Sequence, residues 1–205
     1  MKKLWFSLGC SLLLMTVGCS QSPQAPEQKT SEAPPEGVTG QVALYRMYQM
    51  ARSWAPDCDV LKLNSIHLTE VPPAPGKAGA WEATFISRSK GSARSYTYSV
   101  VEEQGNLHKG VFAGPEQGWS GPSGASAPFL IAAEKVDTDT AYKTALGKAA
   151  DYDKKNPGVN IAFLLEKTSK YANPTWRVIW GESAATSGFS VIVDAMTGQY
   201  LETLH

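Results

Sequence analysis

Two stretches of this 205-residue chain carry the same landmarks in the same order. The landmarks are a tyrosine, a tryptophan and a glycine: Tyr45, Trp81 and Gly105 in the first stretch, and Tyr142, Trp176 and Gly198 in the second. The tyrosine-to-tryptophan and tryptophan-to-glycine separations each differ by only two positions between the stretches. This agreement predicts two units of similar fold. Chance is the alternative, because a helix followed by hairpins is a common arrangement.

A predicted helix opens each stretch. In residues 41–54 apolar side chains recur at helical spacing, and Pro56 ends the pattern. The apolar positions on this face are Leu44, Met47, Tyr48, Ala51 and Trp54. In the second stretch Asp137 and Asp139 supply an N-cap and first-turn acids, and residues 156–158 (Asn-Pro-Gly) end the helix.

Short segments rich in β-branched and aromatic residues follow each helix, bounded by Gly, Pro or Ser as antiparallel strands are. They are residues 59–68, 80–87 and 95–111 in the first stretch, and 159–167, 174–181 and 189–204 in the second. The predicted fold class is therefore α+β, with two repeated units, 39–111 and 136–205, each a helix packed on a three- or four-stranded antiparallel sheet. Residues 112–135, rich in Gly, Pro and Ser, form a predicted connector without a regular element.

The second unit resembles a PepSY domain, a small helix-plus-antiparallel-sheet module of protease propeptides and many bacterial envelope proteins. The resemblance covers about residues 136–205 and rests on the segments DTDTAY, VNIAFLL, the strand beginning at Trp176, and the hairpin VIVDAMTGQYL with its Asp-Ala-x-Thr-Gly turn. The first unit is similar to the family more weakly, since VVEEQGNL has Glu-Glu-Gln-Gly where the family usually has Asp-x-x-Thr-Gly. The resemblance implies a structural class and a tendency to bind or restrain other proteins, and it transfers no catalytic residue.

The first 18 residues have the pattern of an export signal. Lys2 and Lys3 precede an uncharged run that covers residues 4–18. This run is shorter than the roughly 20 residues that a membrane-spanning helix needs. Residues 16–19 (Thr-Val-Gly-Cys) resemble the lipobox of bacterial lipoproteins, although Thr16 replaces the usual Leu or Val. The resemblance implies a lipid on Cys19 that anchors the chain to a membrane; an ordinary signal peptide is the alternative.

Residues 19–38 form a predicted disordered linker, because they are rich in Pro, Gln, Glu and Ser and nearly free of large aliphatic side chains. Ser20, rather than Asp, follows the lipidated cysteine. By resemblance to Gram-negative lipoproteins, this favours the periplasmic face of the outer membrane. Without the signal, the 19 basic and 19 acidic residues become 17 and 19, a formal charge of −2, and there is no basic run. We therefore expect no nucleic-acid partner.

Cys58 is the one thiol that remains once Cys10 leaves with the signal and Cys19 is acylated. No intramolecular disulfide is then expected. Asp57 and Asp59 flank the thiol, which raises its pKa and disfavours a nucleophilic role. We interpret Cys58 as a small, partly buried hydrophobic residue; a dimer-forming or reactive thiol is the alternative.

Asp194 and Gly198 delimit the turn of the last predicted hairpin. A strand with Val191 and Val193 on one face must reverse so that Tyr200 can pair back. Glycine adopts the left-handed backbone conformation at least cost, and an Asp at a turn start accepts hydrogen bonds from backbone N–H groups a few residues on. Both residues are therefore predicted to be structural, and a catalytic role for Asp194 is the disfavoured alternative.

Aromatic residues on two predicted strands share one face of each strand: Trp81 and Phe85 on the first, Trp176 and Trp180 on the second. The favoured interpretation is that they pack against the helices, since large aromatic side chains dominate cores. The alternative is a ligand cleft between sheet and helix or between the two units. Trp119 lies in the predicted connector, where it either packs onto a domain or contacts a partner.

Sequence signatures of catalysis, metal binding or cofactor binding do not occur. His67, His108 and His205 have no metal-ligand spacing, and the usual nucleophile, phosphate-loop and zinc motifs do not appear. Two Asp-x-Asp pairs, at 57–59 and 137–139, fit capping or solvation better than binding of a hard cation. We therefore expect no metal and no cofactor.

The sequence supports one main hypothesis: an anchored envelope lipoprotein that binds or inhibits another envelope protein without catalysis, with a peptidase as one class of partner. Sheet edges or Trp119 would supply the contact. The alternative is a carrier of an apolar small molecule or lipid in the aromatic cleft. An enzyme with a site assembled from distant residues is a third, weaker hypothesis.

Overall fold

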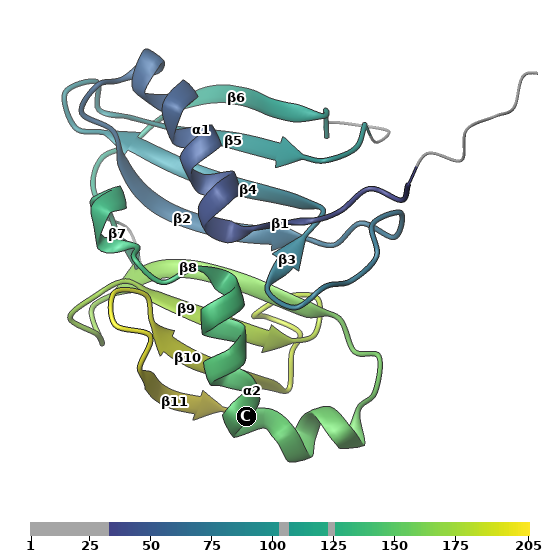
Figure 1. The fold of residues 1–205 in the computed structure, drawn as a ribbon. Coiled ribbons are helices and arrows are strands. Elements are labelled where there is room, and N and C mark those ends of the chain that lie inside the picture. The colour runs from purple at the N-terminus through teal and green to yellow at the C-terminus, as the bar shows by residue number, and fades with distance from the viewer. Residues whose placement is uncertain (1–32, 103–106, 123–125) are drawn as a thin grey trace, which may run out of the picture. The chain divides into compact units, whose positions relative to one another are not determined.

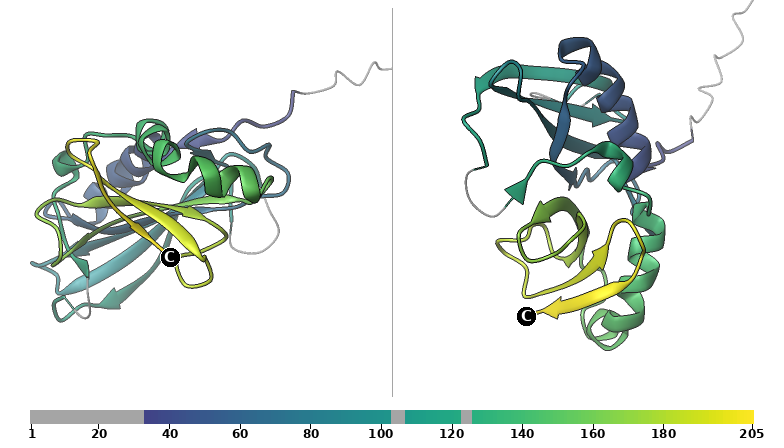
Figure 2. Two further views of the ribbon diagram at one scale, coloured as in Figure 1. Left: turned by 90° about the horizontal axis from the view of Figure 1, so that it is seen from below. Right: turned by 90° about the vertical axis from the view of Figure 1, so that its left-hand side faces the viewer.

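In the part of the chain that the structure describes, an antiparallel sheet carries two α-helices on one of its faces (Figure 1, Figure 2). This computed structural model describes residues 33–102, 107–122 and 126–205, and residues 33–205 group as one compact unit. The predicted signal peptide, Cys19 and most of the predicted linker lie outside the described residues. The α+β class and the antiparallel sheet are confirmed.

The described residues of the first half supply one helix and six strands. The helix is α1 (Gly40–Trp54), within a residue of its predicted limits, and Pro56 follows it. The strands are β1 (Val38–Thr39), β2 (Asp59–Ile66), β3 (Lys77–Ala78), β4 (Ala80–Ser87), β5 (Ser92–Ser99) and β6 (Gly110–Gly118).

The described residues of the second half supply a short 3₁₀ turn (Ile131–Ala133), one α-helix and five strands. The helix is α2 (Thr138–Lys155), with Asp137 as its N-cap and Asn156 as its C-cap, as predicted. The strands are β7 (Ser126–Ala127), β8 (Ile161–Thr168), β9 (Thr175–Trp180), β10 (Phe189–Asp194) and β11 (Tyr200–Leu204). The order of one helix followed by antiparallel strands thus occurs in both halves.

One strand pair joins the two halves. The main sheet runs β11-β10-β9-β8-β2-β4-β5-β6, so β2 from the first half pairs with β8 from the second. Their register places Lys62 opposite Glu166, Leu63 opposite Leu165, and Asn64 opposite Leu164. The small β7 also pairs with β8, and β1 pairs with β3 in a separate two-stranded sheet.

Strand β6 corrects the sequence analysis, which expected no regular element from residue 112 onward. Residues 110–118 pair with β5 at the edge of the sheet. Pro115 and Gly114 weaken the sequence signal for a strand. An edge strand tolerates a proline, because one side of its backbone needs no ladder hydrogen bonds. The ladder partner, rather than the local sequence, therefore determines this strand.

The core lies between the sheet and the helices. From α1 the buried side chains include Ala43, Leu44, Met47 and Ala51, and from α2 they are Ala141, Ala145 and Ala149 together with Thr138. The small alanines of α2 allow its backbone to lie near the sheet. The opposite face carries a cross-strand row through eight strands: Phe112, Thr97, Glu82, Asn64, Leu164, Arg177, Ile192 and Glu202. Its mixed polarity is typical of a solvated sheet face.

The N-termini of the two helices meet and share their caps. Thr39, the N-cap of α1, makes no side-chain cap hydrogen bond. Instead, Gly40 N donates to Thr138 Oγ1 (2.9 Å) and Gln41 N donates to Asp137 Oδ1 (2.9 Å), while Asp137 also caps its own helix. A Cβ at Gly40 would lie 2.7 Å from the Trp176 ring, so this close approach requires glycine. Residues of α2 therefore satisfy the free N–H groups of α1.

The Thr138 hydroxyl is predicted to be essential for this junction. It accepts from Gly40 N and donates to Gly76 O (2.5 Å), and Thr138 is fully buried. In Thr138→Val both backbone groups lose their partner, so we expect the free energy of unfolding to fall by roughly 2 kcal/mol or more. Thr140→Val, at an exposed position in the same helical turn, is the control and should change it by less than about 0.5 kcal/mol. Equal effects in urea unfolding would contradict the bridging role.

Candidate functional site

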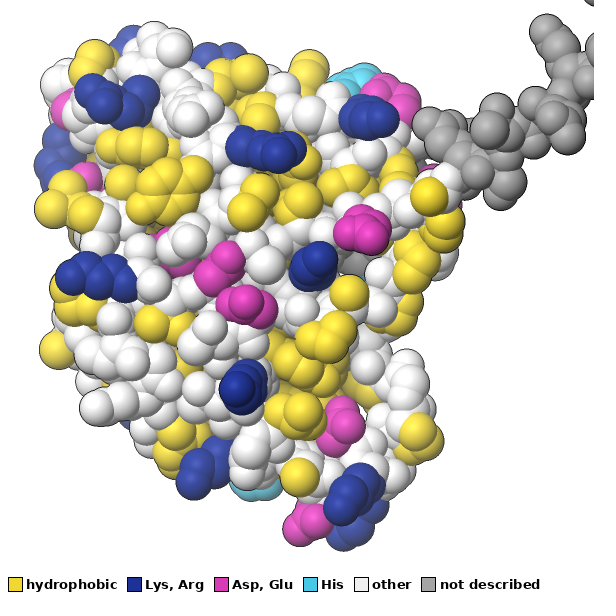
Figure 3. Space-filling view, in the orientation of Figure 1, with side chains coloured by type: hydrophobic (Ala, Val, Ile, Leu, Met, Phe, Trp, Pro, Cys, Tyr) yellow, Lys and Arg dark blue, Asp and Glu magenta, His cyan; other side chains and the backbone are white. Residues whose placement is uncertain are grey.

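A groove of about 280 Å³ lies where the two halves of the sheet meet. We call it the junction groove; it is lined by residues 65–68 and 71–79 from the first half, and by Tyr142, Asp153, 158–163 and 181–182 from the second. Figure 3 shows a notch at the right-hand edge of the molecule, bordered by hydrophobic side chains, in this region. The fold builds the groove from both halves, so it exists because β2 and β8 pair.

The first wall is the proline-rich loop between β2 and β3. Pro72, Pro73 and Pro75 restrict its backbone, because each proline fixes its own φ and limits the residue before it. Leu68 and Val71 are buried in a small hydrophobic cluster with Ala80, and they hold one end of the loop. At the other end, Gly76 O accepts the Thr138 hydroxyl, and β3 pairs with β1. The wall is therefore fixed at both ends.

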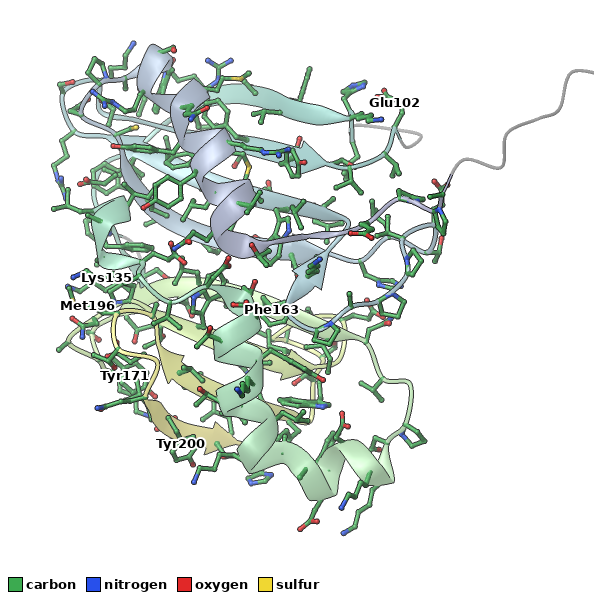
Figure 4. The ribbon with its side chains drawn as sticks, viewed as in Figure 1. Glu102, Lys135, Phe163, Tyr171, Met196 and Tyr200 are labelled. Atoms are coloured by element: carbon green, nitrogen blue, oxygen red, sulfur yellow. The ribbon has the colours of Figure 1, made fainter. Side chains whose placement is uncertain are left out.

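The second wall combines aromatic and carboxylate groups. Tyr142 on α2 stacks on Trp180, with ring centroids 6.5 Å apart, and contacts Phe163, which lies on β8 next to α2 (Figure 4). Asp153 lies about three helical turns after Tyr142, on the same face of α2. Burial, followed by the nearby Asp153 charge, raises the pKa of Tyr142, so its hydroxyl stays protonated.

Two carboxylates at this wall are held by neutral donors. Trp180 Nε1 donates to Asp153 Oδ1 (2.9 Å), and Asn160 Nδ2 donates to Glu182 Oε1 (2.5 Å). The ion pairs within the described residues are Arg88–Asp59, His108–Glu102 and Lys170–Glu202, and none of them involves these two carboxylates. The groove therefore offers uncompensated negative charge on one side, whereas Lys77 and His67 line the other.

The four aromatic residues predicted as core or cleft are all in the core. Trp81, Phe85 and Trp176 are fully buried and Trp180 is 2% exposed, and none of the four lines the junction groove. Trp81 and Trp176 contact each other edge to face across the two halves, at 6.5 Å. Trp81 Nε1 donates to Val38 O and Trp176 Nε1 donates to Val136 O, so their polar atoms are satisfied inside the fold. These side chains pack the seam between the halves.

Trp119 lies directly after β6, and its side chain is partly buried. Its backbone N–H donates to Gly91 O (2.8 Å), which ties this end of β6 to the turn between β4 and β5. The strongly exposed large hydrophobic residues lie elsewhere and include Leu130 and Phe112.

Cys58 is buried, as the sequence analysis predicted. Burial raises the pKa of its thiol to about 11, so the thiol stays protonated. The flanking carboxylates hold the strand end: Asp57 accepts from the Ser87 hydroxyl and Ser89 N, and Asp59 pairs with Arg88.

Asp194 and Gly198 lie in the turn between β10 and β11. Asp194 Oδ1 accepts from Met196 N (2.8 Å) and Thr197 N (2.9 Å), and Asn173 donates to the other oxygen. Burial raises the pKa of the Asp194 carboxyl, but these hydrogen bonds outweigh it and hold the pKa below its usual value. Gly198 has φ +75°, in the left-handed region, and its N–H donates to Asp194 O.

Neither the junction groove nor the buried carboxyl of Glu134 was predicted from the sequence. Glu134 is 2% exposed; its Oε2 accepts from Gln41 Nε2 (3.0 Å), and its Oε1 has no hydrogen-bond partner among the described residues. Burial raises the pKa of Glu134 to about 7. The groove had a partial signal in the sequence, the proline run at residues 72–75. Glu134 had none, because a glutamate in a loop is usually exposed, and its burial results from the contact between the two helix N-termini.

Comparison with known proteins yields one structural similarity. No family model matches the chain, and no curated protein matches it. The crystal structure of a candidate lipoprotein from Clostridium difficile superimposes with a TM-score of 0.46 at 8% sequence identity, covering 78% of this chain and 91% of that one. Within the described residues, no helix is long and apolar enough to cross a membrane.

Substitution by alanine is predicted to have opposite effects at Gly198, in the turn, and at Gly147, inside α2. Gly198→Ala forces a side chain into the left-handed region and should lower the free energy of unfolding by about 1 kcal/mol. Val136, 3.6 Å from the new Cβ, leaves room for it, so backbone strain is the main cause. Gly147→Ala, inside α2 with nothing within 4 Å, should instead raise stability by roughly 0.5–1 kcal/mol. Urea unfolding of both variants checks the pair, and no loss in Gly198→Ala would contradict the assignment.

Glu134 predicts a pH dependence of stability. Between its ordinary pKa of 4.5 and about 7, the unfolded chain has released a proton that the folded chain keeps. Stability from this group is therefore present at pH 4.5 and falls as pH rises toward 7, by on the order of 3 kcal/mol. Glu134→Gln keeps an acceptor for Gln41 and should remove this fall.

Urea unfolding from pH 5 to 8 measures this effect, with exposed Glu36→Gln as the control. We expect the control to keep the slope of the unmodified chain. An unchanged slope in Glu134→Gln would show that another group causes the pH dependence.

Proposed function

We propose that this chain is a lipid-anchored envelope protein that binds a segment of another envelope protein in the junction groove, without catalysis. The anchor is the lipid on Cys19, implied by the lipobox resemblance. Ser20 favours the periplasmic face of the outer membrane. A peptidase is one class of partner that the PepSY resemblance implies.

The observation that carries the proposal is the junction groove itself. Pockets for small molecules usually have volumes of roughly 300–1,000 Å³. At about 280 Å³, the groove suits one or two side chains of an extended segment better than a complete drug-sized molecule. Its fixed proline wall needs little ordering when a ligand binds, and such preorganisation favours affinity.

The position of the groove fits an anchored protein. Residues 33–37 lead into β1, which pairs with β3, and both residues of β3, Lys77 and Ala78, line the groove. The described chain thus enters the fold next to the groove. In this proposal the lipid anchor reaches the fold through the residues before this point.

Tandem PepSY-like units form part of the proposal. Two features support this part of the proposal: each half has one helix followed by antiparallel strands, and Asp194 lies at the turn of the last hairpin. The sheet edges are β6 and β11, and β6 carries Pro115, which disfavours strand addition. Edge β11 is the better candidate for a secondary contact with the same partner.

We do not extend the proposal to a carrier of an apolar molecule in an aromatic cleft. That hypothesis placed an aromatic-lined cleft either between sheet and helix or between the two units. The four aromatic side chains are 0–2% exposed in the core, and none of them lines the junction groove: Trp81, Phe85, Trp176 and Trp180.

A blocked groove tests the proposal. Val159 lines the groove and is 37% exposed, so Val159→Trp should fill the groove without disturbing the core. Val42, 40% exposed on α1 and outside the groove, provides the matched control Val42→Trp. The full chain in detergent is immobilised, exposed to host envelope extract, and the retained proteins are identified by mass spectrometry.

We expect one protein to be retained by the unmodified chain and by Val42→Trp, and to fall at least tenfold with Val159→Trp. Direct titration with that purified protein must reproduce the difference. Equal retention by both variants, or no retained protein, contradicts the proposal. Loss with Trp119→Ala alone would place the contact at Trp119 instead.

A further inference from the structure

We infer that the carboxylate wall of the junction groove binds a cationic side chain, the ammonium of a lysine or the guanidinium of an arginine, carried by an extended peptide segment. This inference rests on the proposed function and specifies the chemistry that the groove recognises.

Two acids from separate elements line this wall. Asp153 lies in the last turn of α2. Glu182 directly follows the end of β9 in the loop toward β10, so strands β8 and β9 separate the two acids in the chain. Each has one oxygen fixed by a neutral donor, Trp180 or Asn160, which orients the carboxylate without cancelling its charge. The described part of the chain provides no Lys, Arg or His nitrogen within 4.0 Å of either carboxylate. A ligand cation would therefore meet oriented carboxylates that lack a counter-ion.

The position of Asp153 strengthens the argument. The C-terminal end of a helix carries partial negative charge, so the α2 dipole does not stabilise a carboxylate there. Trp180 donates a single hydrogen bond, and Asp153 Oδ2 accepts none from the described residues. A bound cation would interact favourably both with the negative end of the helix dipole and with Asp153 Oδ2.

An aromatic ring extends the same wall. Tyr142 lines the groove about three helical turns before Asp153 and stacks at an interplanar angle of 26° on Trp180, the residue that donates to Asp153. Ammonium and guanidinium groups bind aromatic faces, with guanidinium the more frequent. The protonated hydroxyl of Tyr142 can also donate to a peptide carbonyl.

The remaining lining restricts the ligand to a peptide rather than a free amine. Val159, Ile161 and the prolines of the opposite wall offer apolar surface for the methylene stem of a long basic side chain. Lys77 on that wall is a donor without an ion-pair partner in the described part of the chain. It would pair with a carbonyl or carboxylate oxygen, which a peptide carries and a simple amine lacks.

Fluorescence anisotropy with three dye-labelled pentapeptides tests the inference on the full chain in detergent, at 0.15 M salt. The peptides, blocked at the C-terminus, are Ala-Ala-Lys-Ala-Ala, its arginine counterpart, and its norleucine counterpart, which has a stem of similar length without the charge. We expect the two basic peptides to bind at least tenfold more tightly than the norleucine peptide, and to weaken as salt rises.

Isosteric variants assign the effect to the carboxylates. Asp153→Asn keeps an acceptor for Trp180, and Glu182→Gln keeps one for Asn160. We expect each to weaken binding of the basic peptides about tenfold and to leave the norleucine peptide unchanged. Asp151→Asn, at an exposed position outside the groove and close to Asp153 in the chain, is the matched control and should change nothing. Melting temperatures of all variants establish that the fold is kept.

The outcomes separate this inference from the proposed function. If all three peptides bind equally and only Val159→Trp removes binding, the groove binds peptides without recognising charge, and the inference is wrong while the function stands. If no peptide binds at millimolar concentration, the cation site is also refuted, and capture from the envelope extract still decides the function independently.

Discussion

The pairing of β2 with β8 is the interaction on which the rest of the fold depends. Three register positions join two sheets into one, with Leu63 opposite Leu165 on the helix-facing side and Lys62 opposite Glu166 on the other. Trp81 and Trp176 pack across the same seam, so the aromatic residues that mark each half also connect them. The β2–β8 ladder, this packing and the hydrogen bonds from the start of α1 to Asp137 and Thr138 together hold the halves.

Two further features follow from the seam. With β2 and β8 adjacent, α1 and α2 begin side by side, and Asp137 and Thr138 cap both helices. The proline-rich loop is bonded to the same caps through Gly76 O, and the junction groove is lined by this loop, by Tyr142 and Asp153 of α2, and by the start of β8. The same pairing thus brings together the shared helix caps, which stabilise the fold, and the walls of the junction groove, which we propose to bind a peptide segment.

The sequence predicted the local features and not the long-range ones. Both helices, the strands β4 and β9, and the last hairpin follow from periodicity, Pro56, the Asp137 cap and Gly198, which act within a few residues of themselves. Strand β6 was not predicted, because Pro115 and Gly114 weaken the strand pattern in its sequence. Its strand conformation depends on pairing with β5. The burial of Glu134 and the wall formed by Asp153 and Glu182 depend on contacts between segments that are distant in the sequence. Local patterns in a single sequence do not predict such contacts.

Hydrogen exchange of the full chain in detergent tests most directly whether the two halves form one cooperative body with the groove at their junction. The slowest backbone amides of β2 and β8 should exchange with the same free energy as those of β4 and β9, because all open together in global unfolding. If β2 and β8 exchange at a free energy lower by more than about 2 kcal/mol, the halves separate before they unfold. The junction groove would then not be a fixed site, and a preformed binding site between the halves would be contradicted.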